Sequence, residues 1–299
     1  MITVFGSINM DLVAIASKMP RPGETVAGLQ SSASPGGKGA NQALAARRAG
    51  AGVRMAGAIG HDPFGAEALA LLKDASVDLS LVRAVKQSTG TAHVVVDAGG
   101  ENAIVVVPGA NGQVEEDDAR SVLEGMNAGD MLVLQMEIPP CAVEAALVAA
   151  RAKGVVSIFN VAPMTSDAIR LYTGADIVVA NETEFEALAG TPVQSDEQRL
   201  DAMKTLHSQS GRSLVVTLGA DGAVAIHAGE VYRAEGLQIT PVDTVGAGDT
   251  FCGYLAAALD AGLDFASALR RAVVAGSLAC TKSGAQPAIP LMADVQARL

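Results

Sequence analysis

Tryptophan is absent from this sequence, and aromatic residues make up only 3% of its 299 positions. A folded core must therefore be built mainly from alanine, valine, leucine and isoleucine. Hydrophobic residues make up 49% of the chain and charged residues 18%, a composition that excludes an intrinsically disordered protein. The length permits one large α/β domain, alone or with a small appendage.

Basic residues are scarce as well. The chain has 21 lysines and arginines against 32 aspartates and glutamates, which gives a net charge of -11. No stripe of basic residues is visible, so the sequence predicts no nucleic-acid partner. The charge does not exclude an anionic substrate, because backbone amides at a helix start can form a local positive site.

Cysteines and long apolar runs are also few. Cys141, Cys252 and Cys280 form no C-x-x-C pair, which is typical of reduced thiols and not of a disulfide framework. The chain opens on a short strand pattern, without the basic segment and long apolar stretch of a signal peptide. No apolar run is long enough to span a bilayer. We therefore predict a cytoplasmic protein without a membrane partner.

From about residue 115 onward, apolar runs typical of buried strands alternate with helical patterns. Strands are expected at 131–136, 155–159, 176–179, 213–218 and 223–227, and helices near 115–125, 140–152, 182–189, 196–209, 247–261 and 265–281. This alternation predicts an α/β fold, a three-layer α/β/α sandwich around a mostly parallel central sheet.

The early part of the chain breaks this alternation. Extended or apolar runs near 12–19, 24–34 and 91–107 come from two separate segments, and Gly99-Gly100 indicates a hairpin. We expect these runs to form a small β-sheet lid. Its strands would be inserted at about 12–34 and 89–108 into a single domain that spans 1–299.

A glycine-rich turn at the start of the helix near 247–261 is the first candidate for catalysis. Gly246, Ala247 and Gly248 would let backbone amides approach an anion closely, and the helix dipole favours negative charge there. The carboxylate of Asp249 could then take a proton from an attacking hydroxyl while the amides hold a phosphoryl group. Taken alone, Asp249 would fit a simple helix N-cap equally well.

Two further motifs suit the binding of a polyol. Lys38 and Asn41 follow Gly37 at a helix start, and a lysine there opposes the helix dipole, which favours a functional role over a solvated side chain. Asn9 and Asp11 follow the first strand, and their spacing puts both side chains on one side of an extended chain. Either of them could instead form an Asx turn.

Two weaker motifs follow later strands. Asn181 and Glu184 open the helix near 182–189, where acidic residues commonly complement the dipole, but where they could also approach phosphates and hold Mg²⁺ through water. Residues 217–222 form a strand end and a turn, which also fits a hairpin. The four histidines lie near none of these motifs, and we find no catalytic triad or metal-ligand cluster.

In this order and spacing, the motifs resemble the ribokinase-like (PfkB-type) carbohydrate kinase family nearly from end to end. The resemblance is carried by residues 6–11, 22–25, 36–42, 181–184, 217–219, 243–251 and 284–287. It implies ATP-dependent phosphorylation of D-ribose at O5, with Asp249 as general base and residues 246–248 as an anion hole. It also implies a homodimer that forms through the lid.

The resemblance assigns further residues to ligands. The sugar would be held by Asn9, Asp11, Gly37, Lys38, Asn41, Glu137 and Asp249, and the nucleotide by Asn181, Thr217, Gly219, Gly222 and Gly248. An activating K⁺ would bind Asp243 and the carbonyls of Val245, Ala279, Lys282 and Gly284, and Glu184 would organise Mg²⁺ through water. Ala288 departs from a serine that often helps to bind K⁺, and Val273 from a histidine that can flank the adenine.

Two alternatives to a ribose kinase stay open. One is a kinase for another furanose or a nucleoside, such as 2-deoxyribose, fructose or pseudouridine, because a few hydrogen bonds decide which sugar is accepted. The other is a non-catalytic sensor of sugar and nucleotide on the same fold. The presence of Asp249, its two glycines and Glu184 argues against the sensor.

Overall fold

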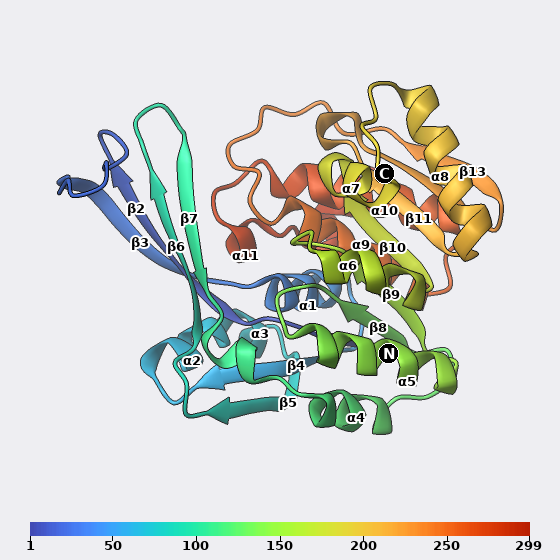
Figure 1. Ribbon diagram of the computed structural model, residues 1–299, viewed down its shortest axis with the longest axis horizontal. Helices are drawn as coiled ribbons and strands as arrows, with labels where there is room; N and C mark the ends of the chain where they lie inside the picture. The colour runs from blue at the N-terminus through green and yellow to red at the C-terminus, as the bar shows by residue number, and fades with distance from the viewer.

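One large sheet with helices on both sides dominates the computed structural model, which describes residues 1–299 (Figure 1). Its nine strands lie in the order β13-β12-β11-β10-β9-β8-β1-β4-β5, and only the last two pairings along the chain, β11–β12 and β12–β13, are antiparallel. The strands are β1 (Ile2–Phe5), β4 (Val53–Gly60), β5 (Asp78–Val85), β8 (Met131–Leu134), β9 (Val156–Asn160), β10 (Ile177–Asn181), β11 (Ser213–Thr217), β12 (Ala223–His227) and β13 (Glu230–Ala234). The predicted mostly parallel central sheet is confirmed.

The helices divide between the two faces of this sheet. One side has α1 (Lys38–Arg48), α9 (Ala247–Asp260) and α10 (Phe265–Ala279), together with the short helices α2 (Pro63–Ala68), α3 (Ala70–Asp74), α11 (Ala285–Ala288) and α12 (Met292–Gln296). The other side has α4 (Glu116–Glu124), α5 (Pro140–Lys153), α6 (Ser166–Leu171), α7 (Glu182–Ala189) and α8 (Asp196–Ser210). Three 3₁₀ turns are η1 (Gly109–Gln113), η2 (Tyr172–Gly174) and η3 (Gly219–Asp221).

Side-chain alternation explains why both faces are covered. Successive residues of a strand point to opposite faces, so Val4 belongs to the core under α1 and α9 while Phe5 belongs to the core under α4 to α8. Strands that are apolar at every position must be buried on both sides. The predicted three-layer sandwich follows and is confirmed. No helix is both long and apolar enough to cross a bilayer.

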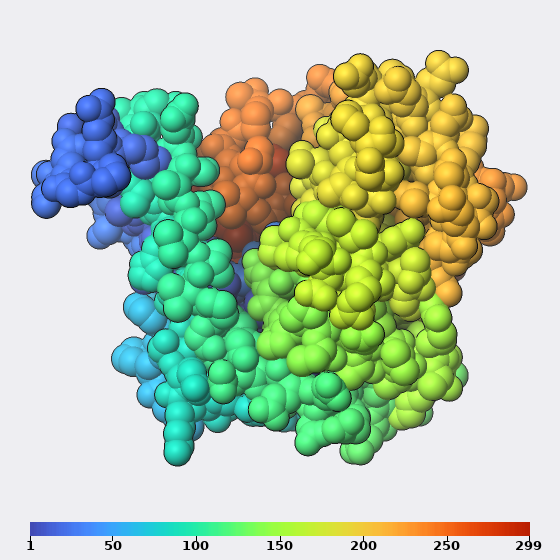
Figure 2. Space-filling model, in the orientation of Figure 1, coloured from blue at the N-terminus to red at the C-terminus, as the bar shows by residue number.

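A separate four-stranded sheet stands away from the main body, at the left of Figure 1. Its order is β3 (Gly28–Gly36), β2 (Asn9–Ala16), β6 (Gly90–Val96) and β7 (Asn102–Val107), with β2 and β6 parallel in the centre. The space-filling view shows a hollow between this sheet and the rest of the molecule (Figure 2). We call this sheet the lid.

Some elements differ from the expected ones. The strand expected at 12–19 begins earlier, at Asn9, and ends at Ala16, so Asn9 and Asp11 lie within β2 instead of before it. The edge strands β5 and β13 and the short helix α6 were not predicted. Both edge strands are largely exposed or half-buried, and their sequences therefore lack the continuous apolar run of a central strand.

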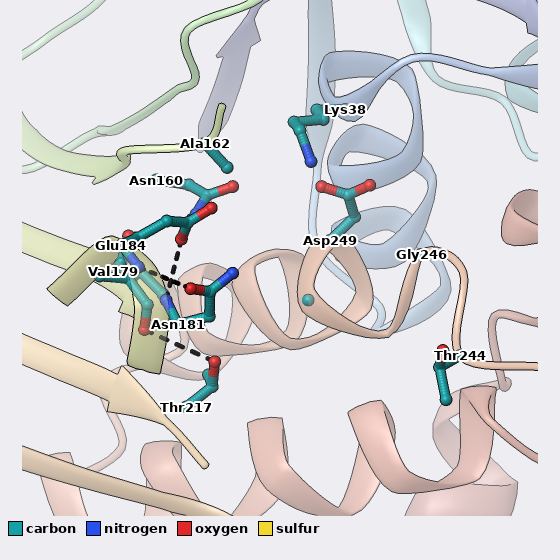
Figure 3. Close-up of a pocket in the computed structure, with 12 residues that line it drawn as sticks. Lys38, Asn160, Ala162, Val179, Asn181, Glu184, Thr217, Thr244, Gly246 and Asp249 are labelled. Carbon is teal, nitrogen blue, oxygen red and sulfur yellow. Dashed lines mark hydrogen bonds between the residues drawn. The ribbon is translucent and has the colours of Figure 1, made fainter. Parts of the chain in front are cut away.

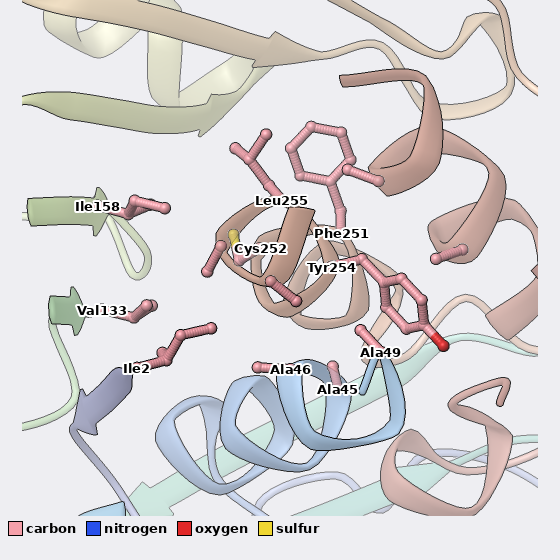
Figure 4. Packing of buried hydrophobic residues seen from close by; sticks show 14 of the residues in the cluster. Ile2, Ala45, Ala46, Ala49, Val133, Ile158, Phe251, Cys252, Tyr254 and Leu255 are labelled. Carbon is pink, nitrogen blue, oxygen red and sulfur yellow. The ribbon is translucent and has the colours of Figure 1, made fainter. Parts of the chain in front are cut away.

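Helices α1 and α9 pack against each other at very short range (Figure 4). A β-carbon added to Gly253 of α9 would lie 2.5 Å from the Cβ atom of Ala45 and 2.5 Å from the carbonyl oxygen of Gln42 in α1. Large side chains such as Tyr254 fill the space on either side of this contact, and Tyr254 is fully buried. The crossing therefore requires a residue without a side chain at position 253.

We expect Gly253→Ala to lower the free energy of unfolding by about 1 to 3 kcal/mol, because the added methyl group meets backbone atoms that cannot rotate away. Urea unfolding followed by circular dichroism measures the change. Gly52→Ala is the matched control, since a β-carbon there meets no atom within 4 Å. Equal stability of the two variants would contradict close packing at Gly253.

Candidate active site

Asp249 lies in the first turn of α9 and is only 6% exposed. It borders a cavity of about 230 Å³ between the starts of α1, α7 and α9. Seven of the predicted site residues line this cavity: Lys38, Asn181, Glu184, Thr217, Gly246, Gly248 and Asp249. Asn160, Ala162, Val179, Ala180 and Thr244 complete it and were not predicted.

The carboxylate of Asp249 is held by two amide side chains from α1. Asn41 Nδ2 donates to Oδ2 at 2.9 Å, and Gln42 Nε2 donates to Oδ1 at 2.9 Å. Lys38, from the first turn of the same helix, points its amino group toward this carboxylate (Figure 3). The negative charge of Asp249 raises the pKa of Lys38, although burial acts in the opposite direction. Lys38 is therefore a permanent cation beside Asp249.

The start of α1 touches the loop after β1, which brings the predicted sugar ligands together. Gly37 has a φ angle of 87°, and a β-carbon there would lie 2.8 Å from the amide nitrogen of Asn9. Glu137 Oε2 accepts hydrogen bonds from Ser7 Oγ at 2.5 Å and from the backbone amide of Lys38 at 3.0 Å. Residues that are distant in sequence thus converge at this edge of the sheet.

Asn9 and Asp11 differ in how they are satisfied. The Asn9 side chain is buried, and its Oδ1 atom accepts from Asn111 Nδ2 at 2.7 Å, while Asn111 Oδ1 accepts from the backbone amide of Ile8. The carboxylate of Asp11 makes no hydrogen bond within the chain. Burial raises the pKa of Asp11 to about 6, and the negative charges of Glu137 and Asp249 add to this effect.

The start of α7 forms the opposite wall of the cavity. Asn181 is the N-cap, and its Oδ1 atom accepts from the backbone amide of Glu184 at 2.8 Å. Glu184 Oε2 accepts in return from the backbone amide of Asn181 at 2.8 Å, so a capping box fixes both side chains (Figure 3). One oxygen of Glu184 is left without a partner in the chain.

Thr217, the last residue of β11, lies in the cavity wall, but the turn that follows leaves Gly219 and Gly222 outside it. Gly222 has a φ angle of 96°, and a β-carbon there would lie 2.1 Å from the carbonyl oxygen of Ala234. Its amide donates to Gly219 and its carbonyl accepts from Leu218. Packing of the turn therefore accounts for Gly222, and its contact with a nucleotide stays a prediction.

Asp243 joins two loops beneath the start of α9. Its Oδ1 atom accepts from the backbone amide of Val245 at 3.0 Å, and its Oδ2 atom accepts from the backbone amide of Gly284 at 2.8 Å. Asp243 is thus adjacent to Val245 and Gly284, two of the other predicted cation ligands. Val273 and Ala288, the two departures from the family pattern, are buried, and neither borders the cavity.

Of the polar residues that were missed at this site, two carried a usable signal, Asn160 and Gln42, and Asn111 did not. Asn160 ends a buried strand, which is the position where ligands of open α/β sheets bind. Gln42 is a polar residue on a helix whose buried side is otherwise mostly alanine. Asn111 lies in η1, far from the other motifs, and no sequence pattern connects it to Asn9.

The family model for pfkB family carbohydrate kinases matches residues 1–292. The chain therefore belongs to the pfkB family of carbohydrate kinases. Among its curated relatives, the ribokinase of Haemophilus influenzae is 35% identical over 290 residues, which cover 97% of this chain and 95% of the relative. The deoxyribokinase of Salmonella typhi is 30% identical over 291 residues, with coverage of 97% and 95%.

The solved structures agree with this family. The structure of Arabidopsis thaliana ribokinase complexed with ribose and ATP matches with a TM-score of 0.89 and 32% sequence identity. The match covers 99% of this chain and 97% of the Arabidopsis chain. The fold is therefore ribokinase-like over its whole length, lid included.

We expect Asp11→Asn to raise the free energy of unfolding at pH 8 by about 1 to 2 kcal/mol and to have little effect at pH 4. In the folded protein the pKa of Asp11 is about 6, above its ordinary value of 3.8. The folded state therefore holds a proton that the unfolded state releases between these values, and stability falls as pH rises through this window. One pKa unit corresponds to about 1.4 kcal/mol. The expected change in stability is smaller than the full conversion, because the side chain is partly exposed and water screens its charge.

Urea unfolding at the two pH values measures this effect. Asp201→Asn, at an exposed position in α8, is the matched control. An equal stabilisation by Asp11→Asn at pH 4 and pH 8 would show that the ionisation of Asp11 does not destabilise the folded state.

Proposed function

We propose that this protein transfers the γ-phosphoryl group of ATP to O5 of D-ribose and releases D-ribose 5-phosphate and ADP. The observation that carries the proposal is the buried carboxylate of Asp249 at the start of α9, with Lys38 directed toward it in the same cavity. The full-length similarity to ribokinases, one of them solved with ribose and ATP, supports the choice of sugar and nucleotide.

Asp249 acts as the general base in this proposal. Its carboxylate takes the proton of the O5 hydroxyl as that oxygen attacks the γ-phosphorus, and the bond to the bridging oxygen of ADP breaks. Helix α9 begins at Ala247, so the amides of Gly248 and Asp249 have no carbonyl one turn earlier in the helix. With Gly246 and Ala247 they form an anion hole for the charge on the transferred group.

The sugar lies, in this proposal, between α1 and the lid, held by Asn9, Asp11, Gly37, Lys38, Asn41 and Glu137. Asn41 supports this placement, because its Oδ1 atom is buried without a hydrogen-bond partner while its Nδ2 atom holds Asp249. An unsatisfied buried acceptor is unfavourable, and a sugar hydroxyl would satisfy it. Asp11 likewise has a carboxylate that is free to accept.

In this proposal the nucleotide lies on the other side of the cavity, against Asn181, Thr217 and Gly248, and extends beyond the cavity to Gly219 and Gly222. Glu184 suits Mg²⁺, because Mg²⁺ prefers oxygen ligands and keeps several of its waters, and one Glu184 oxygen has no partner in the chain. When bound, the ion would neutralise charge on the phosphates. An Mg²⁺ ion that is held through water can be bound with a single carboxylate, and Glu184 supplies one at this wall of the cavity.

We further propose that K⁺ binds beneath the anion hole and raises activity. The carboxylate of Asp243 and the carbonyls of Val245, Ala279, Lys282 and Gly284 form an all-oxygen donor set with one negative charge, which suits a hard monovalent cation. Asp243 already ties the two loops together through Val245 and Gly284. An ion there would stiffen the turn that carries Gly246 to the start of α9.

Two alternatives remain and are separable. A kinase for 2-deoxyribose is the first alternative. The sequence identity to a deoxyribokinase, 30%, is only slightly lower than the 35% identity to a ribokinase. Fructose or a nucleoside such as pseudouridine would need a different fit to the same polar groups. A non-catalytic sensor would bind ribose and ATP without turnover.

An assay of ADP release with ribose, 2-deoxyribose, fructose and several nucleosides, with and without K⁺, tests the proposal. We expect ribose to give the highest kcat/KM, and K⁺ to raise its kcat in the unaltered protein but not in Asp243→Ala.

Asp249→Ala should lower kcat by about 10³-fold, because the general base is lost, while calorimetry still detects ribose binding. Turnover of a nucleoside but not of ribose, or near-normal kcat in Asp249→Ala, would contradict the proposal. Binding without turnover would identify a sensor.

We also propose that two copies of this chain pair through their lids. Strand β7 is an edge strand, and four successive apolar side chains on it, Ile104, Val105, Val106 and Val107, are between 42% and 64% exposed. A strand that exposes apolar groups on both faces favours a partner.

Because the enzyme uses ATP, we propose that it acts in the cytoplasm.

We expect Val105→Lys to weaken dimerisation at least tenfold, because a charged side chain would have to be buried in the interface. Sedimentation velocity over a range of protein concentrations measures the dissociation constant. Val148→Lys is the control, since Val148 is 67% exposed but lies on α5, away from the lid. A monomeric mass of the unaltered protein at all concentrations would refute the dimer.

A further inference from the structure

Gln42 is a fully buried glutamine that contacts the reacting carboxylate but does not line the cavity. Its Nε2 atom donates to Asp249 Oδ1 at 2.9 Å and also to Asn160 Oδ1 at 3.3 Å. It differs in this from Asn41, which holds the other oxygen of Asp249 and is also a proposed sugar ligand. Gln42 can therefore affect the reaction only through the two cavity residues that it contacts, Asp249 and Asn160.

The direction of the Gln42 amide is determined by its neighbours. Gln42 Oε1 accepts from Gln135 Nε2 at 2.7 Å, at the end of β8. Asn160, at the end of β9, donates its Nδ2 atom to the carbonyl of Val179 in β10 and so presents its oxygen to Gln42. With the amide reversed, the Gln42 oxygen would face both the carboxylate of Asp249 and the oxygen of Asn160. Only one orientation satisfies the chain of amides.

Packing alone does not require a glutamine at this position. Apart from Gly39 and Asn41, the other buried residues of α1 are alanines and Leu44, and a side chain of similar volume without polar atoms would fill the space of Gln42. A buried amide is unfavourable unless every polar atom is paired, and both polar atoms of Gln42 are paired. The shorter of the two hydrogen bonds from its donor goes to the one carboxylate on which the proposed chemistry depends.

We propose that Gln42 is a positioning residue for the base: it holds the carboxylate of Asp249 at one rotation and stabilises its charged form, and Gln135 and Asn160 keep the Gln42 amide in the donating orientation. This inference rests on the proposed role of Asp249. A carboxylate fixed at both oxygens by α1 keeps its remaining lone pairs directed at the cavity, where the hydroxyl of the sugar must arrive.

Three variants test this role, with ADP release followed from pH 5 to pH 9 on whichever sugar the unaltered protein phosphorylates. Gln42→Met keeps the volume and removes the donor. We expect kcat to fall by about tenfold at pH 7.5, KM for sugar and ATP to stay within twofold, and the acid limb of the kcat profile to move to higher pH, because the charged carboxylate has lost a donor. Gln135→Met should show the same changes to a smaller extent.

Gln42→Glu covers the case in which the apolar variant does not fold. It preserves the shape and sets a second carboxyl group against Asp249, so the pair retains a proton and the acid limb should move further than in Gln42→Met. The charged or titratable groups whose fields reach Asp249 are Lys38 on α1, Asp11 on β2 and Cys252 on α9, and none of them changes in these variants.

The results distinguish this inference from the proposed function. If the unaltered protein phosphorylates none of the sugars or nucleosides tested, the proposed function fails first. If it is active and Gln42→Met keeps kcat within twofold, raises only KM, or leaves the acid limb in place, Gln42 does not position the base. An acid limb that does not move in Gln42→Glu also overturns the inference.

Discussion

The close crossing of α1 and α9 is the contact on which the site depends. Gly253 lets the two helices approach until the backbone of α9 meets the Ala45 side chain and the Gln42 carbonyl of α1. Asp249 lies one helical turn before Gly253, and Asn41 lies one turn before Ala45, so the same crossing sets the amides of α1 against the carboxylate. Alanines on the buried side of α1 serve the same end, since larger side chains would hold the helices apart.

The same geometry brings several carboxylates close to one lysine. The carboxylates of Asp11, Glu137 and Asp249 surround one cation, Lys38, and the pKa of Asp11 is raised by its burial and, to a smaller extent, by the charges of the other two carboxylates. An ionised Asp11 therefore destabilises the folded protein, and a ligand that donates hydrogen bonds to it can offset this effect. Sugar hydroxyls can do so, because each donates to a carboxylate without adding charge.

Much of this architecture could be predicted because local patterns carry it. The parallel sheet followed from apolar runs that alternate with helices, and Asp249, Lys38, Asn181 and Glu184 were found because each stands beside a helix start. The edge strands β5 and β13 could not be found in this way, since an edge strand needs no continuous apolar run. The lid strand β2 begins earlier than its apolar run because pairing with Gly36 and Gly90, and not apolarity, sets its first residue.

The sequence by itself determined the fold class, the family motifs and the identity of the candidate base, since these depend on periodicity and on residues that are neighbours in the chain. Tertiary structure decided the partners of these residues. Asn111 meets Asn9 across 102 positions, and Gln42 meets Asp249 across 207, contacts that no local pattern encodes. Hydrogen bonds between buried side chains depend on which elements pack together, and that packing is settled only when the two cores on either side of the sheet are complete.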